Sequence, residues 1–419
     1  MPDSARSGGR RERIALVLAG GGARGAYEAG ALAALAPALS ESDQTPDIIV
    51  GTSIGALNGS FLAARAHEPL ETAAAAARDM WLELDWCDAL RPLASPSELG
   101  RLLGAGAMFA KLPGADVSAL LDPSPLRGTL ERRVAFDQIA RNVDDGSLSA
   151  AAVVATAYAS TRSVVFHHGG GQPGFNHLHA IDYAATALAP EHVLASAAIP
   201  GAFPAIEISR PAAAAGWYGD GGVRLNAPLQ PALALGAERV VVIGLNSSVT
   251  HTRGSARPDA LDGVAQLLQV ALADQLADDV ARLAAVNERL AASASSTASS
   301  GPRHRKVPYI FIAPGDRLEI GRRAREVYKD RYAAPIGLLR NANLALLGRF
   351  LNADRSAVHG ELLSYLFLAR EFIDELIALG ESDAKRWLAT RHGAGLWQVG
   401  RLPPGKPNTP PARGRPRKT

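Results

Sequence analysis

Three short segments of the sequence contain residues that could together hydrolyse an ester. A glycine loop occupies residues 20–25 (GGGARG), a serine stands between glycines at residues 51–55 (GTSIG), and Asp220 precedes two further glycines. Ester hydrolysis through an acyl-enzyme needs an activated nucleophile, a base, and N–H donors for the oxyanion. The three segments could supply these parts, with Ser53 as nucleophile and Asp220 as base.

The segment around Ser53 has the G-x-S-x-G pattern of a nucleophile elbow. In such an elbow the serine lies on a strained turn between a strand and a helix, where flanking side chains would clash. The apolar run before Gly51 predicts the strand, and the sequence from Ile54 onward predicts the helix. Gly55 provides the second small residue. Taken alone, the pentapeptide is also compatible with a purely structural turn.

The glycine loop permits two interpretations. It satisfies the dinucleotide-binding pattern G-x-G-x-x-G, but that site needs an acidic residue after the second strand, to hold the ribose. The sequence has Gly51, Thr52 and Ser53 there, and Asp47 lies at the start of the strand. Consecutive backbone N–H groups of Gly20, Gly21 and Gly22 suit an oxyanion better. No cofactor is expected.

The surroundings of these motifs resemble the patatin-like phospholipases. That family combines a G-G-G-x-R-G loop and a G-x-S-x-G elbow with a distant D-G-A/G. Residues 195–204 (ASAAIPGAFP) resemble the segment that precedes the family aspartate, and residues 220–229 (DGGVRLNAPL) resemble its closing stretch. The resemblance covers residues 12–245 and extends to a predicted strand at 307–312.

The resemblance implies a three-layer α/β/α hydrolase with a mainly parallel sheet and additional C-terminal helices. It implies a Ser53–Asp220 dyad without histidine, acting on glycerophospholipids or lysophospholipids, and it needs no metal. The implied supporting residues are Arg24, Gly25, Gly51, Gly55, Gly221 and Gly222. An aspartate with the ordinary pKa of about 3.9 is a poor base for a hydroxyl. Asp220 should therefore lie in a dry pocket that raises its pKa.

Other functions stay open on the sequence alone. A conventional triad would need a histidine late in the chain, and the candidates are His251, His304, His359 and His392. An α/β-hydrolase, however, places its elbow after several strands, whereas one strand precedes Ser53. Acyl-carrier acyltransferases also use a serine elbow, with a Gly-His-Ser pattern. In this sequence Thr52 stands at the position of that histidine. A neutral acylglycerol lipase, thioesterase or transacylase could use the same dyad, and a weakly catalytic lipid-binding regulatory protein is a further alternative.

The predicted elements alternate in the manner of a parallel α/β sheet. Strands are predicted at residues 14–19, 47–50, 151–157, 163–167, 239–245 and 307–312, and helices at 26–39, 54–66, 70–84, 126–140, 191–198, 261–292 and across 320–391. We expect a disordered N-terminus (1–12), a catalytic domain (13–316) with a surface excursion at 92–125 and a flexible serine-rich loop (293–301), a C-terminal helical region (317–400), and a disordered basic, proline-rich tail (401–419).

Composition and charge restrict the cellular location and the partners that we expect. The formal net charge of +3 comes from the two ends, and the remainder of the chain is net acidic. Cys87 is the single cysteine, which excludes an internal disulfide and favours a reducing, cytoplasmic location. No apolar run predicts a signal peptide or a spanning helix. We expect no nucleic-acid partner, and leave peripheral contact with the inner face of the membrane, and the oligomeric state, open.

Three further clusters have simple structural interpretations. Histidines at 167, 168, 177 and 179 bracket a glycine-rich stretch and are expected on an exposed hairpin rim rather than around a metal. Met80, Trp81 and Trp86 are expected to face the core, with contact to lipid as the alternative. A basic cluster predicts a solvated helix face, with an anionic-lipid surface as the alternative, and consists of Arg322, Arg323, Arg325, Lys329 and Arg331.

Overall fold

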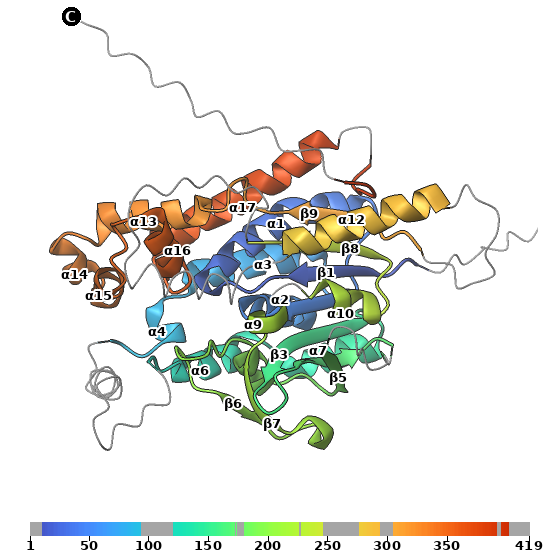
Figure 1. Ribbon diagram of the computed structural model, residues 1–419, viewed down its shortest axis with the longest axis horizontal. Helices are drawn as coiled ribbons and strands as arrows, with labels where there is room; N and C mark the ends of the chain where they lie inside the picture. The colour runs from blue at the N-terminus through green and yellow to red at the C-terminus, as the bar shows by residue number, and fades with distance from the viewer. Residues whose placement is uncertain are drawn as a thin grey trace, which may run out of the picture.

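The computed structural model describes residues 11–93, 120–171, 173, 180–225, 228–245, 276–293, 305–391 and 395–401. These residues form a sheet of nine strands flanked by helices (Figure 1). Seven strands follow the order β5-β4-β3-β2-β1-β8-β9, and β7 pairs with both β3 and β6 beside that path. The strands are β1 (Ile14–Leu18), β2 (Ile48–Thr52), β3 (Ala150–Ala157), β4 (Ser163–Gly169), β5 (Ile181–Ala185), β6 (Ile206–Ile208), β7 (Gly216–Asp220), β8 (Arg239–Ile243) and β9 (Tyr309–Ile312).

The centre of the sheet is parallel. β1 pairs in parallel with β2 and with β8, β2 pairs in parallel with β3, and β8 with β9. Every residue of β1 and β2 is buried, because helices cover both faces of the sheet. The parallel register carries the ends of β1 and β2 to the same edge, with Leu18 opposite Gly51. The expected mainly parallel α/β sheet is confirmed.

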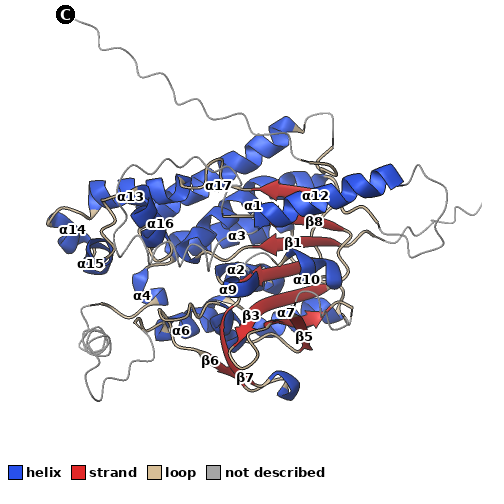
Figure 2. Ribbon diagram, viewed as in Figure 1, coloured by secondary structure: helices blue, strands red, loops and turns tan. Residues whose placement is uncertain are grey.

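Helices form a layer on each face of the sheet (Figure 2). In this view α10 (Leu229–Ala234) and α12 (Leu276–Ser293) lie in front of the strands, and α1 (Gly25–Glu41) and α3 (Leu70–Glu83) lie behind them. The arrangement has three layers, as expected. Among the described residues up to 245, the other helices are α2 (Ile54–Ala64), α4 (Trp86–Ala89), α6 (Ser124–Arg133), α7 (Phe136–Asp144), α8 (Pro190–Ser196) and α9 (Gly222–Leu225), with short 3₁₀ turns η1 (Gly22–Arg24) and η2 (Ala212–Ala214).

The expected C-terminal helices are present, and they pack on the sheet layers. They are α13 (Glu319–Arg331), α14 (Ile336–Arg340), α15 (Ala342–Phe350), α16 (Ala357–Ser364) and α17 (Arg370–Thr390). α17 lies against α1 at very short range: a Cβ atom on Gly380 would be 2.1 Å from the Tyr27 carbonyl oxygen. The Tyr27 hydroxyl donates to Asp383 Oδ2 at 2.9 Å within the same buried contact.

Two local expectations were wrong. The predicted helix 126–140 is two helices, α6 and α7, because the chain turns at Val134, and this turn lets both Leu130 and Ile139 reach the core. The glycine-rich stretch after β4 is not a hairpin, since β4 and β5 run parallel. His167 is buried rather than exposed, and its Nδ1 lies 2.9 Å from the Gly169 carbonyl oxygen.

Several expectations concern residues outside the described part of the chain. These are the first ten residues, most of the excursion at 92–125, His177 and His179, residues 261–275 of the predicted long helix, most of the serine-rich loop, and nearly all of the basic tail. None of the helices in the described ranges has both the length and the apolar character needed to cross a bilayer.

The contact between α1 and α17 generates a prediction about stability. Gly→Ala in a helix interior normally stabilises by up to about 1 kcal/mol. Gly380→Ala should instead destabilise by about 1–3 kcal/mol, because the added methyl group would overlap the α1 backbone. Gly128→Ala in α6 is the matched control, since its methyl group would meet only the end of the Arg132 side chain. Urea unfolding followed by circular dichroism measures both; a stabilised Gly380→Ala would contradict the close packing.

Candidate active site

Ser53 lies at the tip of a strained turn between β2 and α2. Its backbone has φ 53° and ψ −121°, in the left-handed region that non-glycine residues avoid. Such a conformation costs on the order of 1–3 kcal/mol and persists only where the surrounding structure enforces it. Here the preceding residues belong to a fully buried strand and the next residue begins a helix. The predicted strand–turn–helix context is confirmed.

The flanking glycines are required by close backbone contacts. A Cβ atom on Gly51 would be 2.0 Å from the Gly55 carbonyl oxygen, so the turn closes on itself. A Cβ atom on Gly55 would be 2.5 Å from the Leu18 carbonyl oxygen, at the end of β1. Gly55 thus lets the start of α2 press against the end of β1, where the glycine loop begins. This contact places Ser53 beside the loop.

Asp220 reaches Ser53 from the end of β7, which runs antiparallel to β3 with Asp220 opposite Ala155. The Ser53 hydroxyl donates to Asp220 Oδ2 at 2.7 Å, and the Gly222 backbone N–H donates to Oδ1 at 2.6 Å. Gly221 is needed for this approach, because its Cβ atom would be 2.2 Å from the Val154 carbonyl oxygen. Two residues 167 positions apart in the chain therefore form one hydrogen-bonded pair.

The environment of Asp220 makes its carboxylate a stronger base. The side chain is almost completely buried, and burial raises the pKa of Asp220 from its ordinary value of 3.8 to about 7. The hydrogen bonds from Ser53 and Gly222 act in the opposite direction and lower this pKa. Desolvation dominates because a carboxylate loses its hydration shell in a dry site. A pKa near neutrality suits a general base.

The glycine loop lies at the carboxyl end of β1, the neighbour of β2. Gly22 has φ +61°, and a Cβ atom there would be 2.0 Å from the Tyr365 carbonyl oxygen. The Ala23 N–H donates to that same oxygen at 2.9 Å. The next residues form η1 and then α1. The loop is therefore fixed between the end of the sheet and the C-terminal helices, with its glycines on the edge that carries Ser53.

Comparison with known proteins identifies the family. The family model for patatin-like phospholipase matches residues 16–233, which include the glycine loop, the elbow and Asp220. The chain belongs to the patatin-like phospholipase family. This is a family of lipid hydrolases, and the suspected resemblance is confirmed.

No curated protein matches the chain. Among solved structures, VipD from Legionella pneumophila is similar at 13% identity with a TM-score of 0.30, over 73% of this chain and 62% of that one. The chain therefore spans less than two thirds of the VipD chain.

Contacts from outside the family-matched segment hold the patatin-like glycine loop. Arg24 is fully buried, and its guanidinium donates to Glu361 Oε2 at 2.5 Å and to the Glu361 carbonyl oxygen at 2.8 Å. Its Nε donates to Ser364 Oγ at 2.8 Å, and the guanidinium stacks over the Tyr365 ring. Glu361 also accepts from the Gly321 N–H at 2.9 Å. Sequence reasoning missed Glu361 because no motif surrounds it.

A second buried network holds the other side of the loop. Glu28 accepts from the Ala19 N–H through one carboxylate oxygen and from Asn58 Nδ2 through the other, each at 2.8 Å. Asn58 Nδ2 also donates to the Gly25 carbonyl oxygen, and Asn58 Oδ1 accepts from Trp81 Nε1. α1, α2 and α3 thereby fix the loop. Trp81 was expected in the core, as were Met80 and Trp86, and all three are buried.

Ser196 is a further residue that the motif search did not select for the site. Its hydroxyl accepts from the Ser53 backbone N–H at 2.7 Å and donates to the Val154 carbonyl oxygen at 2.6 Å. One hydroxyl thus links the strained elbow to β3. Its position in the family-like segment 195–204 was a signal, but nothing in the sequence indicated its partner.

Histidine has no part in the hydrogen bond that Ser53 donates. His359 lies in α16, where its Nδ1 is 2.8 Å from Ser356 Oγ. The other histidines considered for a triad, His251, His304 and His392, lie outside the described residues. Across the described ranges, no group of three or more histidine, cysteine or acidic side chains could hold a metal ion.

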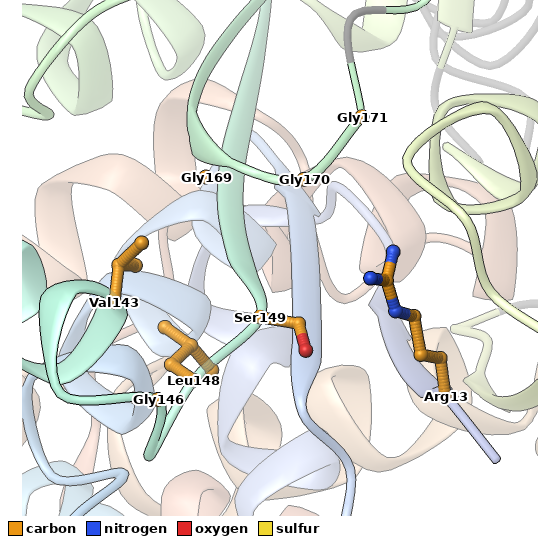
Figure 3. A pocket seen from close by; sticks show the side chains of 8 residues that line it. All are labelled: Arg13, Val143, Gly146, Leu148, Ser149, Gly169, Gly170 and Gly171. Atoms are coloured by element: carbon orange, nitrogen blue, oxygen red, sulfur yellow. The ribbon is translucent and has the colours of Figure 1, made fainter. Parts of the chain in front are cut away.

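The structure also forms a hollow of about 400 Å³ at a different edge of the sheet (Figure 3). It is bordered by the chain entering β1 and β3 and by the glycines that end β4. The lining residues are Arg13, Val143, Gly146, Leu148, Ser149, Gly169, Gly170 and Gly171. Ser149 donates to Asp47 Oδ2, which helps to join β2 and β3. The lining of this hollow does not include a serine hydroxyl that donates to a buried aspartate, as Ser53 does to Asp220.

The raised pKa of Asp220 predicts how stability depends on pH. Between about pH 4 and pH 7 the folded state keeps a proton that the unfolded state has released, so the free energy of unfolding should fall as pH rises. Asp220→Asn removes this dependence and should stabilise the protein at pH 8 by on the order of 3 kcal/mol, with little effect at pH 4. Urea titrations at both pH values measure the difference; an equal effect at both would contradict a raised pKa.

Proposed function

We propose that this protein is a serine acyl-ester hydrolase that releases fatty acid from glycerophospholipids or lysophospholipids. The observation that carries the proposal is the 2.7 Å hydrogen bond from Ser53 Oγ to the buried carboxylate of Asp220. Membership of the patatin-like family supports a lipid substrate. The dyad geometry supports the ester chemistry independently of that membership.

In the proposed acylation step, Ser53 Oγ attacks the carbonyl carbon of the ester while Asp220 Oδ2 accepts the hydroxyl proton. The carbonyl oxygen becomes an oxyanion, and backbone N–H groups of the glycine loop at residues 20–22 donate to it. The Ala23 N–H is occupied by the Tyr365 carbonyl oxygen, which fixes the direction of the loop. Donors held in place before the reaction stabilise developing charge without reorganisation.

Collapse of the tetrahedral intermediate breaks the bond to the alcohol. Asp220 returns the proton to the departing alkoxide oxygen, which leaves as a lysophospholipid or glycerophosphodiester. Water then attacks the acyl-enzyme while Asp220 takes one of its protons, and that proton returns to Ser53 Oγ as the fatty acid departs. One carboxylate performs all of these proton transfers. A pKa near 7 suits this role, since Asp220 must accept and release a proton once in acylation and once in deacylation.

Labelling of Ser53 tests the proposal directly. A fluorophosphonate probe should label the wild-type protein and fail to label Ser53→Ala, because the probe needs an activated serine hydroxyl. Asp220→Asn should slow labelling and hydrolysis of a soluble ester by roughly 10²–10⁴-fold, the usual contribution of a general base. In the wild type, the rates of labelling and hydrolysis should rise with pH as Asp220 ionises, and the midpoint of this rise should lie near pH 7.

Fatty-acid release from phospholipid, lysophospholipid, triacylglycerol and acyl-thioester substrates then separates the proposed phospholipase from a neutral lipase or thioesterase. Labelling of Ser53→Ala at the wild-type rate would show that another serine reacts. Full activity of the Asp220→Asn variant would refute the assignment of Ser53 and Asp220 as a catalytic dyad. A folded wild type that neither labels nor hydrolyses any of these esters would favour a non-catalytic lipid-binding protein.

The contacts of Arg24 predict that Glu361 positions the oxyanion loop. Glu361→Gln removes a buried counter-charge, and Ser364→Ala removes one hydrogen bond to Arg24 while keeping the ion pair. Both should lower kcat by roughly tenfold or more, the cost of misplacing an oxyanion donor. The pH midpoint near 7 should be unchanged, because the pKa of Asp220 is set by its burial and by hydrogen bonds from Ser53 and Gly222.

Glu375→Gln is the matched control, since Glu375 forms a partly exposed ion pair with Arg323 in the same helical region. Loss of a buried ionic partner costs about 3–5 kcal/mol of stability, so the milder Ser364→Ala keeps the test valid if Glu361→Gln does not fold. Folded variants with wild-type kcat would show that Arg24 and its partners serve stability alone.

A further inference from the structure

The helices α14 and α15 expose large apolar side chains. Half of the exposed large hydrophobic residues of the described chain fall within residues 336–350. Leu339 is 87% exposed, Phe350 67% and Ile336 58%, and Leu338 and Leu346 are exposed to a lesser degree. Single exposed apolar residues are ordinary, whereas several within one short segment favour an interaction site. We call these five side chains the α14–α15 surface.

Packing of the two helices does not depend on this surface. The inner side of α15 provides packing contacts through Leu344 and Leu347, which are buried, and α14 buries Gly337. Two glycines permit close approach: a Cβ atom on Gly337 would be 2.2 Å from the Tyr332 carbonyl oxygen, and one on Gly348 would be 2.0 Å from the Tyr328 ring. The outward side chains are therefore additional to what holds the helices in place.

Positive charge accompanies the apolar side chains. Residues 331–353 contain Arg331, Arg340 and Arg349, all exposed, and no acidic residue. The flanking acids are Asp330 and Asp354, and Arg340 has one long, exposed ion pair with Glu371 at 3.8 Å. An apolar surface with arginines at its border is typical of segments that lie in the interface of an anionic membrane.

Structural contacts engage three arginines of the basic cluster predicted on α13, whose last member, Arg331, precedes α14 and α15. Arg322 pairs with Asp316 at 2.8 Å, Arg323 pairs with Glu319 and Glu375, and Arg325 donates to the Asp354 carbonyl oxygen. The cluster also lacks the exposed apolar neighbours of α14 and α15. The structure therefore favours α14 and α15 over α13 as the lipid-facing region.

The α14–α15 surface lies on the side of the molecule that contains the Ser53 edge of the sheet. The arrowheads of β1 and β9 point toward the side where α4, α14, α15 and α16 lie (Figure 2). Asn343 of α15 accepts from the Leu93 N–H at 2.9 Å, just after α4. α16 holds the glycine loop through Glu361 and Ser364. Contact with a bilayer through α14 and α15 would thus bring the membrane to the side where the ester must enter.

We propose that the α14–α15 surface docks the protein onto an anionic phospholipid bilayer. Leu339 and Phe350 enter the boundary between headgroups and acyl chains, and Arg340 and Arg349 lie against lipid phosphates. The proposal rests on the proposed function, because it specifies where a lipid hydrolase meets its substrate. A bilayer explains both the apolar cluster and the arginines at its border.

Vesicle binding tests the docking surface in the full chain carrying Ser53→Ala, which leaves the vesicles intact. The parent should sediment with phosphatidylcholine vesicles that contain phosphatidylglycerol. Leu339→Asp combined with Phe350→Asp should weaken this binding by roughly tenfold or more, because burial of apolar area drives interfacial binding. Val286→Asp is the matched control: Val286 is exposed on α12, away from the proposed surface, and its change should leave binding intact.

Charge is tested separately. Arg340→Gln combined with Arg349→Gln should weaken binding to anionic vesicles several-fold at low salt and much less at high salt, where exposed charges are screened. The proposal would be overturned if neither pair of substitutions weakened vesicle binding. A parent that binds no vesicles would also overturn it, as would one that forms oligomers which the Leu339→Asp, Phe350→Asp pair dissociates.

Two substrates separate failure of docking from failure of the proposed function. With Ser53 intact, the Leu339→Asp, Phe350→Asp variant should hydrolyse a soluble short-chain nitrophenyl ester at the wild-type rate and vesicle lipid at least roughly tenfold more slowly, as reduced interfacial binding requires. Equal loss on both substrates would show damage to the site and overturn the docking role. Wild-type protein inactive on both but still binding vesicles would refute the proposed hydrolase alone.

Discussion

The site depends on keeping the Asp220 carboxylate out of water while Ser53 donates a hydrogen bond to it. An isolated buried carboxylate is unfavourable, so the structure must supply both the dry surroundings and the few donors that satisfy it. Ser53 Oγ and the Gly222 N–H are those donors. The sheet makes this possible because β2 and β7 both pair with β3, which brings the ends of two distant strands together. β3 is therefore the element against which Ser53 and Asp220 are aligned.

The strained elbow and the glycine loop share one mechanical problem, which is that backbone must approach backbone very closely. Gly55 permits contact with the end of β1, Gly221 permits contact with β3, and Gly22 permits contact with Tyr365. The third contact comes from the C-terminal helices, although the family match ends at residue 233. Arg24, inside that match, finds its counter-charge in Glu361, outside it. The helices beyond the matched segment thus fix the glycine loop beside Ser53.

The sequence allowed prediction of the parallel sheet, the elbow and the identity of the Ser53–Asp220 pair, because each has a local pattern. Continuous apolar runs predicted β1, β2 and β8, and the strand–turn–helix context of Ser53 followed from them. Glu361, Ser196 and Asn58 could not be predicted, since each acts through a partner far away in the sequence. β5, β6 and β7 were missed because they are short strands of mixed burial. The parallel direction of β5 follows from its pairing with β4, and the histidine-flanked glycines between the two strands gave no sign of that pairing.

Two costs are concentrated at Ser53 and Asp220: a left-handed backbone at one residue and a desolvated carboxylate at the other. Together they amount to several kcal/mol, comparable with the net stability of many domains. Packing of buried strands and of α1 against α17 must offset these costs, and the glycine contacts make that packing tight. Because the elbow and the carboxylate lie on different strands, relaxing either one would lengthen the hydrogen bond between them. The rigidity of the sheet edge is therefore a condition for the proposed chemistry, since proton transfer from Ser53 depends on holding that distance.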